Sequence, residues 1–170
     1  MSGGEGRVRV ATLTASDTRT EESDTGGRLL RELLAAAGFE LAPHAIVRED
    51  EASLAAAFDA LLADPTIGAV VSTGGTGIAP RDRTIDVLAP RLERELEGFG
   101  EAFRRLSWDE VGPRSILSRA LAGTARGKVL VALPGSLGAV RLGVTAILAP
   151  VLSHAVALAS GSHRGGHVGP

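Results

Sequence analysis

The chain has 170 residues and a formal net charge of −2, from 18 basic and 20 acidic residues, and it contains no cysteine. This length fits one domain with its own core, and the lack of cysteine excludes thiolate catalysis, cysteine zinc sites and disulfides. The near-neutral balance gives no general attraction to nucleic acid or anionic lipid. Any phosphate-binding site must therefore be local, and we expect no nucleic-acid partner.

The two ends of the chain differ in composition from the rest. Residues 1–6 are polar and glycine-rich, without the apolar stretch of a signal peptide. Residues 161–170 are again glycine-rich. We therefore expect flexible ends at 1–6 and 161–170, a domain at 7–160, and a cytoplasmic location.

The most apolar stretch runs from about Val140 to Ala159 and is interrupted by Arg141, Pro150 and His154. It falls short of the roughly 18 uninterrupted apolar residues of a membrane span. This stretch is predicted to be a buried or amphipathic helix, and no membrane partner is expected.

The first half of the chain alternates between strand and helix patterns. Asp24 is a candidate helix N-cap, Gly38 a stop signal, and Pro43 marks its strand as an edge strand. The predicted order is a strand at 7–14, a polar loop at 16–25, a helix ending at Gly38, a strand at 39–47, a helix at 51–63 and a strand at 67–73.

The second half continues the alternation. We expect a helix from Asp82 or Arg83 to about Pro90, a short strand at 91–96, short helices at 102–110 and 115–121, a strand at 128–133 and a final helix to about Ser160. Such alternation predicts a mostly parallel sheet covered on both faces. Ligands of these sheets bind beyond the carboxyl ends of the strands.

A glycine-rich turn follows the buried strand at 67–73. Gly74-Gly75-Thr76-Gly77 leaves backbone N–H groups open where a helix is about to begin, and such turns bind anions. Pro80 stands where a dinucleotide fingerprint has its third glycine, and no Gly-Lys-Ser/Thr follows, so Rossmann and Walker A loops are not indicated. The alternative is a plain tight turn, but Arg81 adds a cation and favours the anion site.

Acidic residues stand at two places near this turn. Asp82 lies where a helix N-cap belongs, so it is a cap, a magnesium or substrate ligand, or both. The run Arg48-Glu49-Asp50-Glu51 ends one strand and opens a helix. Its carboxylates suit Mg²⁺, but they also suit a first helical turn, where the dipole favours negative charge. The residues alone leave these alternatives open.

Pro134-Gly135-Ser136 repeats the pattern of a strand, a small-residue turn and a helix start. Ser136 can cap the helix, and Gly135 would let a ligand approach the backbone; simple capping is the alternative. The aromatic residues Phe99, Phe103 and Trp108 indicate core or subunit contacts.

Several segments, in this order, resemble the MoaB/Mog family of molybdenum cofactor biosynthesis proteins. The most specific is residues 73–84, Thr-Gly-Gly-Thr-Gly-Ile-Ala-Pro-Arg-Asp-Arg-Thr. Similar to the family's other motifs are Ser16-Asp17, Asp24-Thr-Gly-Gly, Gly98-Phe-Gly-Glu, Leu106-Ser-Trp, Leu117-Ser-Arg-Ala and Leu133-Pro-Gly-Ser. The resemblance spans about residues 7–158.

The resemblance implies a three-layer α/β/α sandwich with a mostly parallel central sheet, assembled as a homotrimer or homohexamer, that binds molybdopterin. In active members it implies Mg²⁺- and ATP-dependent adenylylation of molybdopterin, with a molybdenum-insertion enzyme as a partner. By position, Asp50 and Asp82 match the catalytic carboxylates and are candidate magnesium ligands. The implied substrate and nucleotide contacts are Ser16, Asp17, Gly74, Gly75, Thr76, Gly77, Arg81, Glu101, Ser118, Pro134, Gly135 and Ser136.

The sequence also departs from the family pattern. Arg48-Glu49 precedes Asp50, where Mog-type enzymes tend to have proline and MoaB-type members a lysine–glutamate sequence, whereas Arg81-Asp82 indicates the active type. Asp86 replaces a common glutamate. Two alternatives therefore stand beside the enzyme: a non-catalytic MoaB-type binding or scaffold protein, and a nucleotide hydrolase like the competence-damage domain, which the short chain disfavours.

Overall fold

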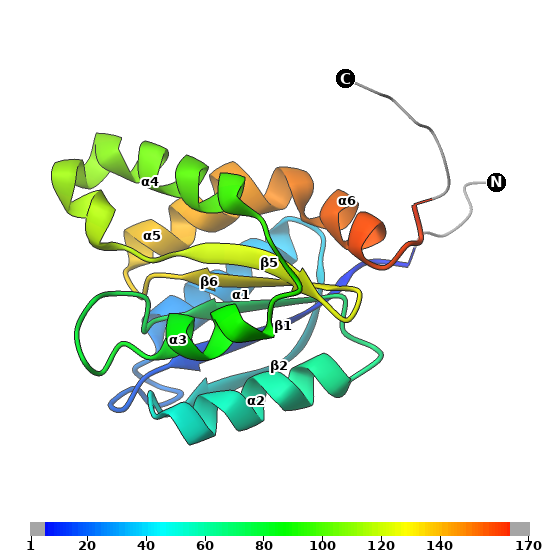
Figure 1. The fold of residues 1–170 in the computed structure, drawn as a ribbon, viewed down its shortest axis with the longest axis horizontal. Helices are drawn as coiled ribbons and strands as arrows, with labels where there is room; N and C mark the ends of the chain where they lie inside the picture. The colour runs from blue at the N-terminus through cyan, green and yellow to red at the C-terminus, as the bar shows by residue number, and fades with distance from the viewer. Residues whose placement is uncertain (1–5, 164–170) are drawn as a thin grey trace.

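The computed structural model describes residues 6–163, so most of the flexible ends predicted at 1–6 and 161–170 lie outside the described residues. A six-stranded sheet of order β2-β1-β3-β6-β5-β4 forms the centre (Figure 1). The strands are β1 (Arg9–Ala15), β2 (Glu40–Val47), β3 (Ala69–Thr73), β4 (Arg94–Glu95), β5 (Leu121–Ala125) and β6 (Lys128–Leu133). The first four strands in the order pair in parallel, and β5 and β4 add antiparallel pairs.

Helices cover both faces of this sheet. The α-helices are α1 (Thr25–Ala36), α2 (Glu51–Ala63), α3 (Thr84–Leu88), α4 (Glu97–Val111), α5 (Leu137–Leu142) and α6 (Ala149–Ala159). A π-helix (Gly143–Leu148) joins α5 to α6, and 3-10 helices occupy Ala89–Arg91 and Gly112–Leu117.

Side-chain alternation along the strands assigns each helix to a face. In β3, Ala69 and Val71 join the core under α1, α4 and α5–α6, whereas Val70 joins the core under α2 and α3. Because both faces are buried, β6 is an unbroken apolar run from Val129 to Leu133, and the threonines and the serine of β1 and β3 are buried as well. The predicted three-layer α/β/α sandwich with a mostly parallel sheet is confirmed.

Local signals placed several element boundaries correctly. Asp24 caps α1 by accepting a hydrogen bond from the Gly27 N–H at 2.9 Å. Gly38 follows that helix with a φ of +93°, which favours glycine. Pro43 lies in β2, which is an edge strand as predicted.

One prediction in the second half was wrong. Residues 115–121 are not an α-helix, because a 3-10 helix ends at Leu117 and the unpredicted strand β5 begins at Leu121. β5 and β6 form a hairpin whose turn, Arg126-Gly127, has two positive φ values, 50° and 74°. This geometry is that of the turns that join twisted antiparallel strands. The small residues of Leu121–Ala125 hid the strand, although the glycine of the turn was a usable signal.

The apolar stretch near the C-terminus lies in one continuous helix from Leu137 to Ala159, in agreement with the predicted final helix. By length and composition this helix could cross a membrane, with a mean hydropathy of 1.9. Pro150 is tolerated because it lies at the start of α6, just after the π-helix. Every fourth residue from Val140 to Val156 packs into the core, so the helix forms part of one outer layer of the sandwich. Its outer face exposes Val151 and Leu158.

Candidate functional site

Three loops meet at the carboxyl edge of the parallel strands, because β1, β3 and β6 all end there. Gly74 N–H donates to the Leu133 carbonyl at 2.9 Å, and Thr73 Oγ1 donates to the Pro134 carbonyl at 3.0 Å. A Cβ on Gly74 would lie only 2.5 Å from the Ala15 carbonyl oxygen. The topology therefore brings these loops together at one edge of the sheet, as the sequence predicted.

The loops enclose an open cavity of about 250 Å³. Its lining comprises Thr14, Ala15, Ser16, Arg19, Asp24, Gly26, Glu49, Thr73, Gly74, Gly75 and Gly135. A second hollow of about 360 Å³ lies against the outer side of the 74–82 loop, and Ile78, Ala79, Pro80, Asp82, Arg83, Asp86 and Arg119 line it. The predicted residues Ser16, Gly74, Gly75 and Gly135 therefore line the first hollow, and Asp82 lines the second.

The glycine turn has a conformation that only glycine adopts readily. Gly74 and Gly75 have φ values of +93° and +70°, and a Cβ on Gly75 would collide with the Thr84 hydroxyl. Thr84 Oγ1 donates to the Gly74 carbonyl at 2.9 Å, and Thr84 N–H donates to the Gly75 carbonyl at 3.1 Å. The turn is therefore braced from its carbonyl side, which suits it to binding anions through N–H groups.

The two predicted catalytic carboxylates have different local roles. Asp82 is not the cap of α3, whose N-cap position is Arg83; Asp82 Oδ2 instead accepts from the Ala79 N–H at 2.9 Å. Asp50 does cap α2, accepting from Ser53 N–H at 2.8 Å and from Ser53 Oγ at 2.7 Å. The capping alternative is thus wrong for Asp82, whereas the alternative of an acidic helix start fits the 48–51 run, where Asp50 is the cap and Glu51 lies in the first turn of α2.

Glu49, rather than Asp50, lines the cavity. Its side chain is 13% exposed, against 50% for Asp50. We missed Glu49 as a separate candidate, although the sequence held a usable signal: aspartate is a favoured N-cap and glutamate is not, so Asp50 was the better cap of the two.

One arginine joins the acidic residues of this edge. Arg81 lies 3.4 Å from Asp17 Oδ2 and 3.6 Å from Glu49 Oε2, and Asp17 Oδ1 accepts from the Glu49 N–H at 3.0 Å. Burial raises the pKa of Glu49, and the charges of Asp17 and Asp82 raise it further against the opposing effect of Arg81. Repulsion among these carboxylates means that a bound cation would be favoured here.

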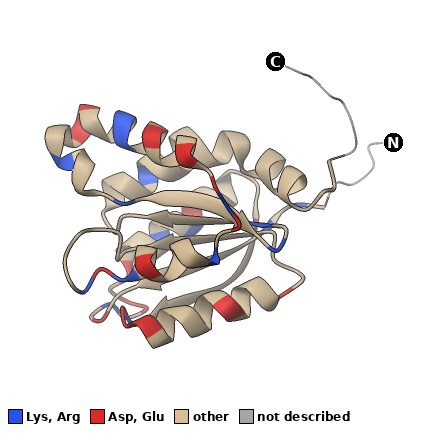
Figure 2. Cartoon of the chain, viewed as in Figure 1, with Lys and Arg blue, Asp and Glu red and all other residues tan. Residues whose placement is uncertain are grey.

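The charges of the described residues are otherwise interspersed. Figure 2 shows both signs along α4, whereas α2 carries acidic residues alone. Within residues 6–163, no three His, Cys, Asp or Glu side chains form a group that could hold a metal ion. A cation at this edge would therefore need ligands supplied by a bound phosphate or water.

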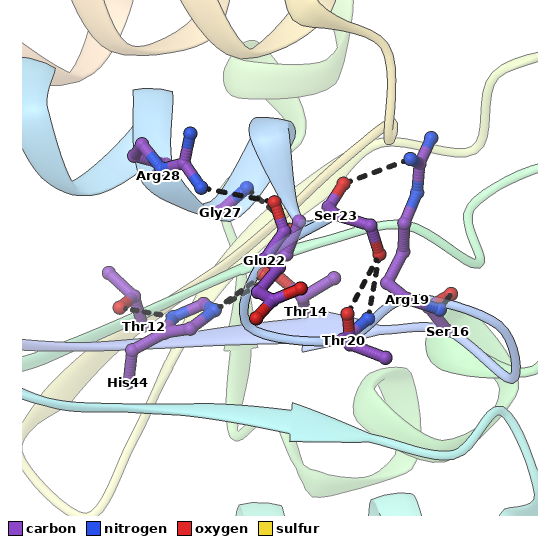
Figure 3. Close-up of polar contacts among 11 residues, drawn as sticks. Thr12, Thr14, Ser16, Arg19, Thr20, Glu22, Ser23, Gly27, Arg28 and His44 are labelled. Atoms are coloured by element: carbon purple, nitrogen blue, oxygen red, sulfur yellow. Dashed lines mark hydrogen bonds and ion pairs between the residues drawn. The ribbon is translucent and has the colours of Figure 1, made fainter.

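The loop between β1 and α1 is ordered by its own side chains (Figure 3). Ser16 Oγ accepts from the Thr18 and Arg19 N–H groups at 3.2 and 3.1 Å. Ser23 Oγ accepts from the Thr20 N–H at 2.9 Å, and Arg19 Nη1 donates to the Ser23 carbonyl at 3.0 Å. This folding turns Arg19 and Ser16 toward the cavity that they line.

Asp24, at the end of that loop, is the centre of a buried polar network. Its Oδ2 lies 2.8 Å from Thr14 Oγ1 and 2.9 Å from His44 Nε2, and His44 Nδ1 lies 2.8 Å from Thr12 Oγ1. The His44 ring bridges the Asp24 carboxylate and the Thr12 hydroxyl, but Thr12 is only 2% exposed, so the network presents no accessible nucleophile of a hydrolytic triad there. Burial raises the pKa of Asp24, but hydrogen bonds from Gly27, His44 and Thr14 outweigh it and leave the pKa lowered.

Gly27 leaves no space for a side chain beside this network. A Cβ there would collide with Asp24 Oδ2 and crowd His44 and Thr14. Glycine to alanine inside a helix ordinarily stabilises by about 1 kcal/mol. We expect Gly27→Ala to destabilise instead, by roughly 2 kcal/mol through overpacking.

Urea unfolding measures this effect, with Gly98→Ala as the control. Gly98 lies in the first turn of α4, and a Cβ added to it would meet only open space, so its substitution should be neutral or stabilising. Equal effects of the two substitutions would refute the steric account.

The remaining predicted contacts divide into two groups. Thr76 is buried, and its carbonyl and that of Gly77 both accept from Arg119, while Ser136 caps α5 through the Ala139 N–H at 3.2 Å. Glu101 is exposed on α4, and Ser118 Oγ accepts from the Ala120 N–H. Neither of these last two lines either hollow.

The chain is similar to known proteins in both sequence and fold. Residues 11–154 match the family described as a probable molybdopterin binding domain. The molybdenum cofactor biosynthesis protein B of Staphylococcus carnosus is 44% identical over 152 residues, covering 88% of this chain and 89% of that protein.

Solved structures give the same result. A crystal structure of a molybdenum cofactor biosynthesis protein B superposes with a TM-score of 0.88 at 41% identity, covering 92% of this chain and 98% of that one. The tungsten cofactor synthesizing protein MoaB of Pyrococcus furiosus superposes with a TM-score of 0.81 at 36% identity, covering 92% and 99%. The chain therefore belongs to the molybdopterin-binding domain family of molybdenum cofactor biosynthesis proteins.

Proposed function

We propose that this protein acts in molybdenum cofactor biosynthesis by binding molybdopterin at the carboxyl edge of the sheet and adenylylating its phosphate with ATP. The observation that carries the proposal is the arrangement at this edge. A braced glycine turn at Gly74-Gly75 lies beside one arginine, Arg81, and the carboxylates of Glu49 and Asp82.

The reaction needs little covalent chemistry from the protein. An oxygen of the pterin phosphate attacks the α-phosphorus of ATP, the bond from that phosphorus to the β-phosphate oxygen breaks, and pyrophosphate leaves with the electron pair. Such transfers depend on positioning and charge neutralisation. The glycine turn, apart from the Gly74 N–H that donates to Leu133, and the Arg81 guanidinium would supply N–H donors to phosphate oxygens.

The acidic residues suit a magnesium ion that arrives with ATP. Mg²⁺ is commonly bound by one or two carboxylates together with substrate phosphates and water, and it would neutralise charge that develops on the triphosphate. Glu49 and Asp82 both adjoin Arg81, since Glu49 Oε2 lies 3.6 Å from Arg81 Nε and Asp82 is the next residue, whose charge raises the pKa of Glu49. We propose these two as the ligands, and Asp50, which the resemblance implied, as the alternative to Glu49.

A second candidate function is a non-catalytic protein that holds molybdopterin and passes it to a molybdenum-insertion enzyme. The observation that favours it is that the similar proteins compared above carry the names protein B and MoaB. This candidate predicts that pterin binds without ATP turnover.

We also propose that copies of the chain associate as a homotrimer or homohexamer. Phe99 and Phe103 are core residues, but Trp108 and Val111 at the end of α4 are each 48% exposed. Leu117 in the next segment is exposed to the same extent. An exposed apolar group of this kind is typical of a subunit contact.

The proposed activity is tested by incubating the purified protein with molybdopterin, ATP and magnesium and separating the products by chromatography. Adenylylated pterin in amounts equal to the pyrophosphate released supports the enzyme. Retention of the pterin with ATP unconsumed supports the holding protein.

Charge-removing substitutions of equal size separate Glu49 from Asp50. We expect Glu49→Gln to lower kcat by about 100-fold, the usual scale for one charge-stabilising group. We expect Asp50→Asn to change kcat less than about threefold, because asparagine caps a helix as well as aspartate does. Steady-state kinetics at saturating ATP measures both. A larger loss in Asp50→Asn than in Glu49→Gln would return the role to Asp50.

A further inference from the structure

Arg119 donates several hydrogen bonds to the glycine-rich loop, and the proposed function gives this residue no role. It lies between the 3-10 helix that ends at Leu117 and strand β5. Its Nε donates to the Gly77 carbonyl at 2.9 Å, and its Nη2 donates to the Asp82 carbonyl at 3.0 Å. Its backbone N–H donates to the Thr76 carbonyl at 2.9 Å.

The two side-chain bonds hold both ends of the loop at residues 77–82, which we call the arch. The outer part of the arch is solvent-exposed, with Ile78 68% exposed. Its internal bonds are few: the Asp82 N–H donates to the Ala79 carbonyl, and the Ala79 N–H donates to Asp82 Oδ2, both at 2.9 Å. A short exposed loop of this kind would otherwise sample many conformations.

Only arginine has donors arranged to bond the Gly77 and Asp82 carbonyls at the same time. The planar guanidinium presents N–H groups on three nitrogens in fixed directions, whereas lysine offers one nitrogen on a flexible stem. The third nitrogen, Nη1, donates to Asp86 Oδ1 at 2.9 Å. The hydrogen bond from Arg119 lowers the pKa of Asp86, so this ion pair persists at neutral pH and fixes the guanidinium plane.

We propose that Arg119 is a positioning residue that holds the 77–82 arch in place. Arg119 does not line the first cavity; it acts through the arch, which carries Arg81 and Asp82. With the arch in this position, Arg81 lies 3.4 Å from Asp17 and 3.6 Å from Glu49. The catalytic consequence rests on the proposed function, but the effect on the arch does not.

The test that is independent of activity is amide hydrogen exchange of the free protein. In Arg119→Ala we expect the Ala79 and Asp82 amides to exchange at least about tenfold faster, while β3 and β6 amides keep their wild-type rates. Asp86→Asn retains both carbonyl bonds and should change the arch amides less than about threefold. Unchanged exchange of the arch, or an equal increase across the sheet, would overturn the proposal.

Kinetics then tests whether the arch position affects turnover. We expect Arg119→Ala to lower kcat about 30-fold and Arg119→Lys to recover little of it, because one ammonium cannot grip both ends. In an Asp82→Asn background, the further loss from Arg119→Ala should shrink to less than about threefold, as for residues that act through one another. Fully additive losses would contradict action through Asp82. If the wild type shows no turnover, the proposed function fails, while the exchange result still decides the role of Arg119.

Discussion

Replacing Asp82 by asparagine should lower turnover by at least about 100-fold while leaving the fold intact. The Asp82 carboxylate follows Arg81 at the edge of the sheet, and its charge raises the pKa of Glu49. It therefore contributes to the negative potential that would hold the magnesium ion of Mg·ATP. Asparagine retains an oxygen that can accept from the Ala79 N–H, so the turn that Asp82 forms should persist. The substitution therefore removes the charge and little else.

Pterin binding and thermal unfolding are the controls for this prediction. We expect Asp82→Asn to bind molybdopterin within about fivefold of the wild-type affinity and to unfold at nearly the wild-type temperature. Asp82→Ala should lose the Ala79 bond as well and should bind more weakly. Wild-type kcat in Asp82→Asn would remove this carboxylate from the proposed mechanism.

Replacing Asp24 by alanine should cause the largest loss of stability among the polar substitutions of this edge, about 3 kcal/mol. The change removes the α1 cap and leaves the Thr14 hydroxyl and the His44 ring buried without their shared acceptor. For a protein of this size, that loss corresponds to a fall in Tm of roughly 6–12 °C. Asp109→Ala is the matched control, because its ion pair with Arg105 is exposed on both sides, at 65% and 71%, and exposed ion pairs contribute little.

The pH dependence of stability tests the same network. The pKa of Asp24 is lower in the folded protein than in the unfolded chain, so its stabilisation is complete above the ordinary aspartate value of about 3.9 and is lost as pH falls through the folded value. Below about pH 4, the unfolding free energy of the wild type should therefore fall more steeply than that of Asp24→Asn. Urea unfolding over this range measures both slopes, and equal slopes would show that Asp24 gains nothing from its partners.

The sequence was sufficient for the sandwich and for the loops that form the site. Parallel strands end at one edge, so a turn after β3 and a turn after β6 had to meet, as Gly74 and Gly135 do. The strand β5 escaped prediction because its small residues carry a weak β preference. Because β5 is also short, its residues form a strand mainly through their pairing with β6.

The roles of individual carboxylates were harder to predict than their location. Glu49 and Asp50 are adjacent, yet one lines the cavity and the other caps α2. Both residues follow the end of β2 at Val47, and the start of α2 at Glu51 makes Asp50 the N-cap and leaves Glu49 outside the helix. The role of Arg119 was not predictable either, since the three acceptors of its side chain lie 33 to 42 positions away in sequence.

The most direct test of the proposed adenylyl transfer uses ATP labelled at the α-phosphate. Wild-type protein, molybdopterin and magnesium should move the label onto the pterin, with one pyrophosphate released for each label transferred, and Asp82→Asn should transfer at least about 100-fold more slowly. Label that remains entirely in ATP while the protein retains bound molybdopterin would contradict adenylyl transfer and leave the site as a place where the pterin is held.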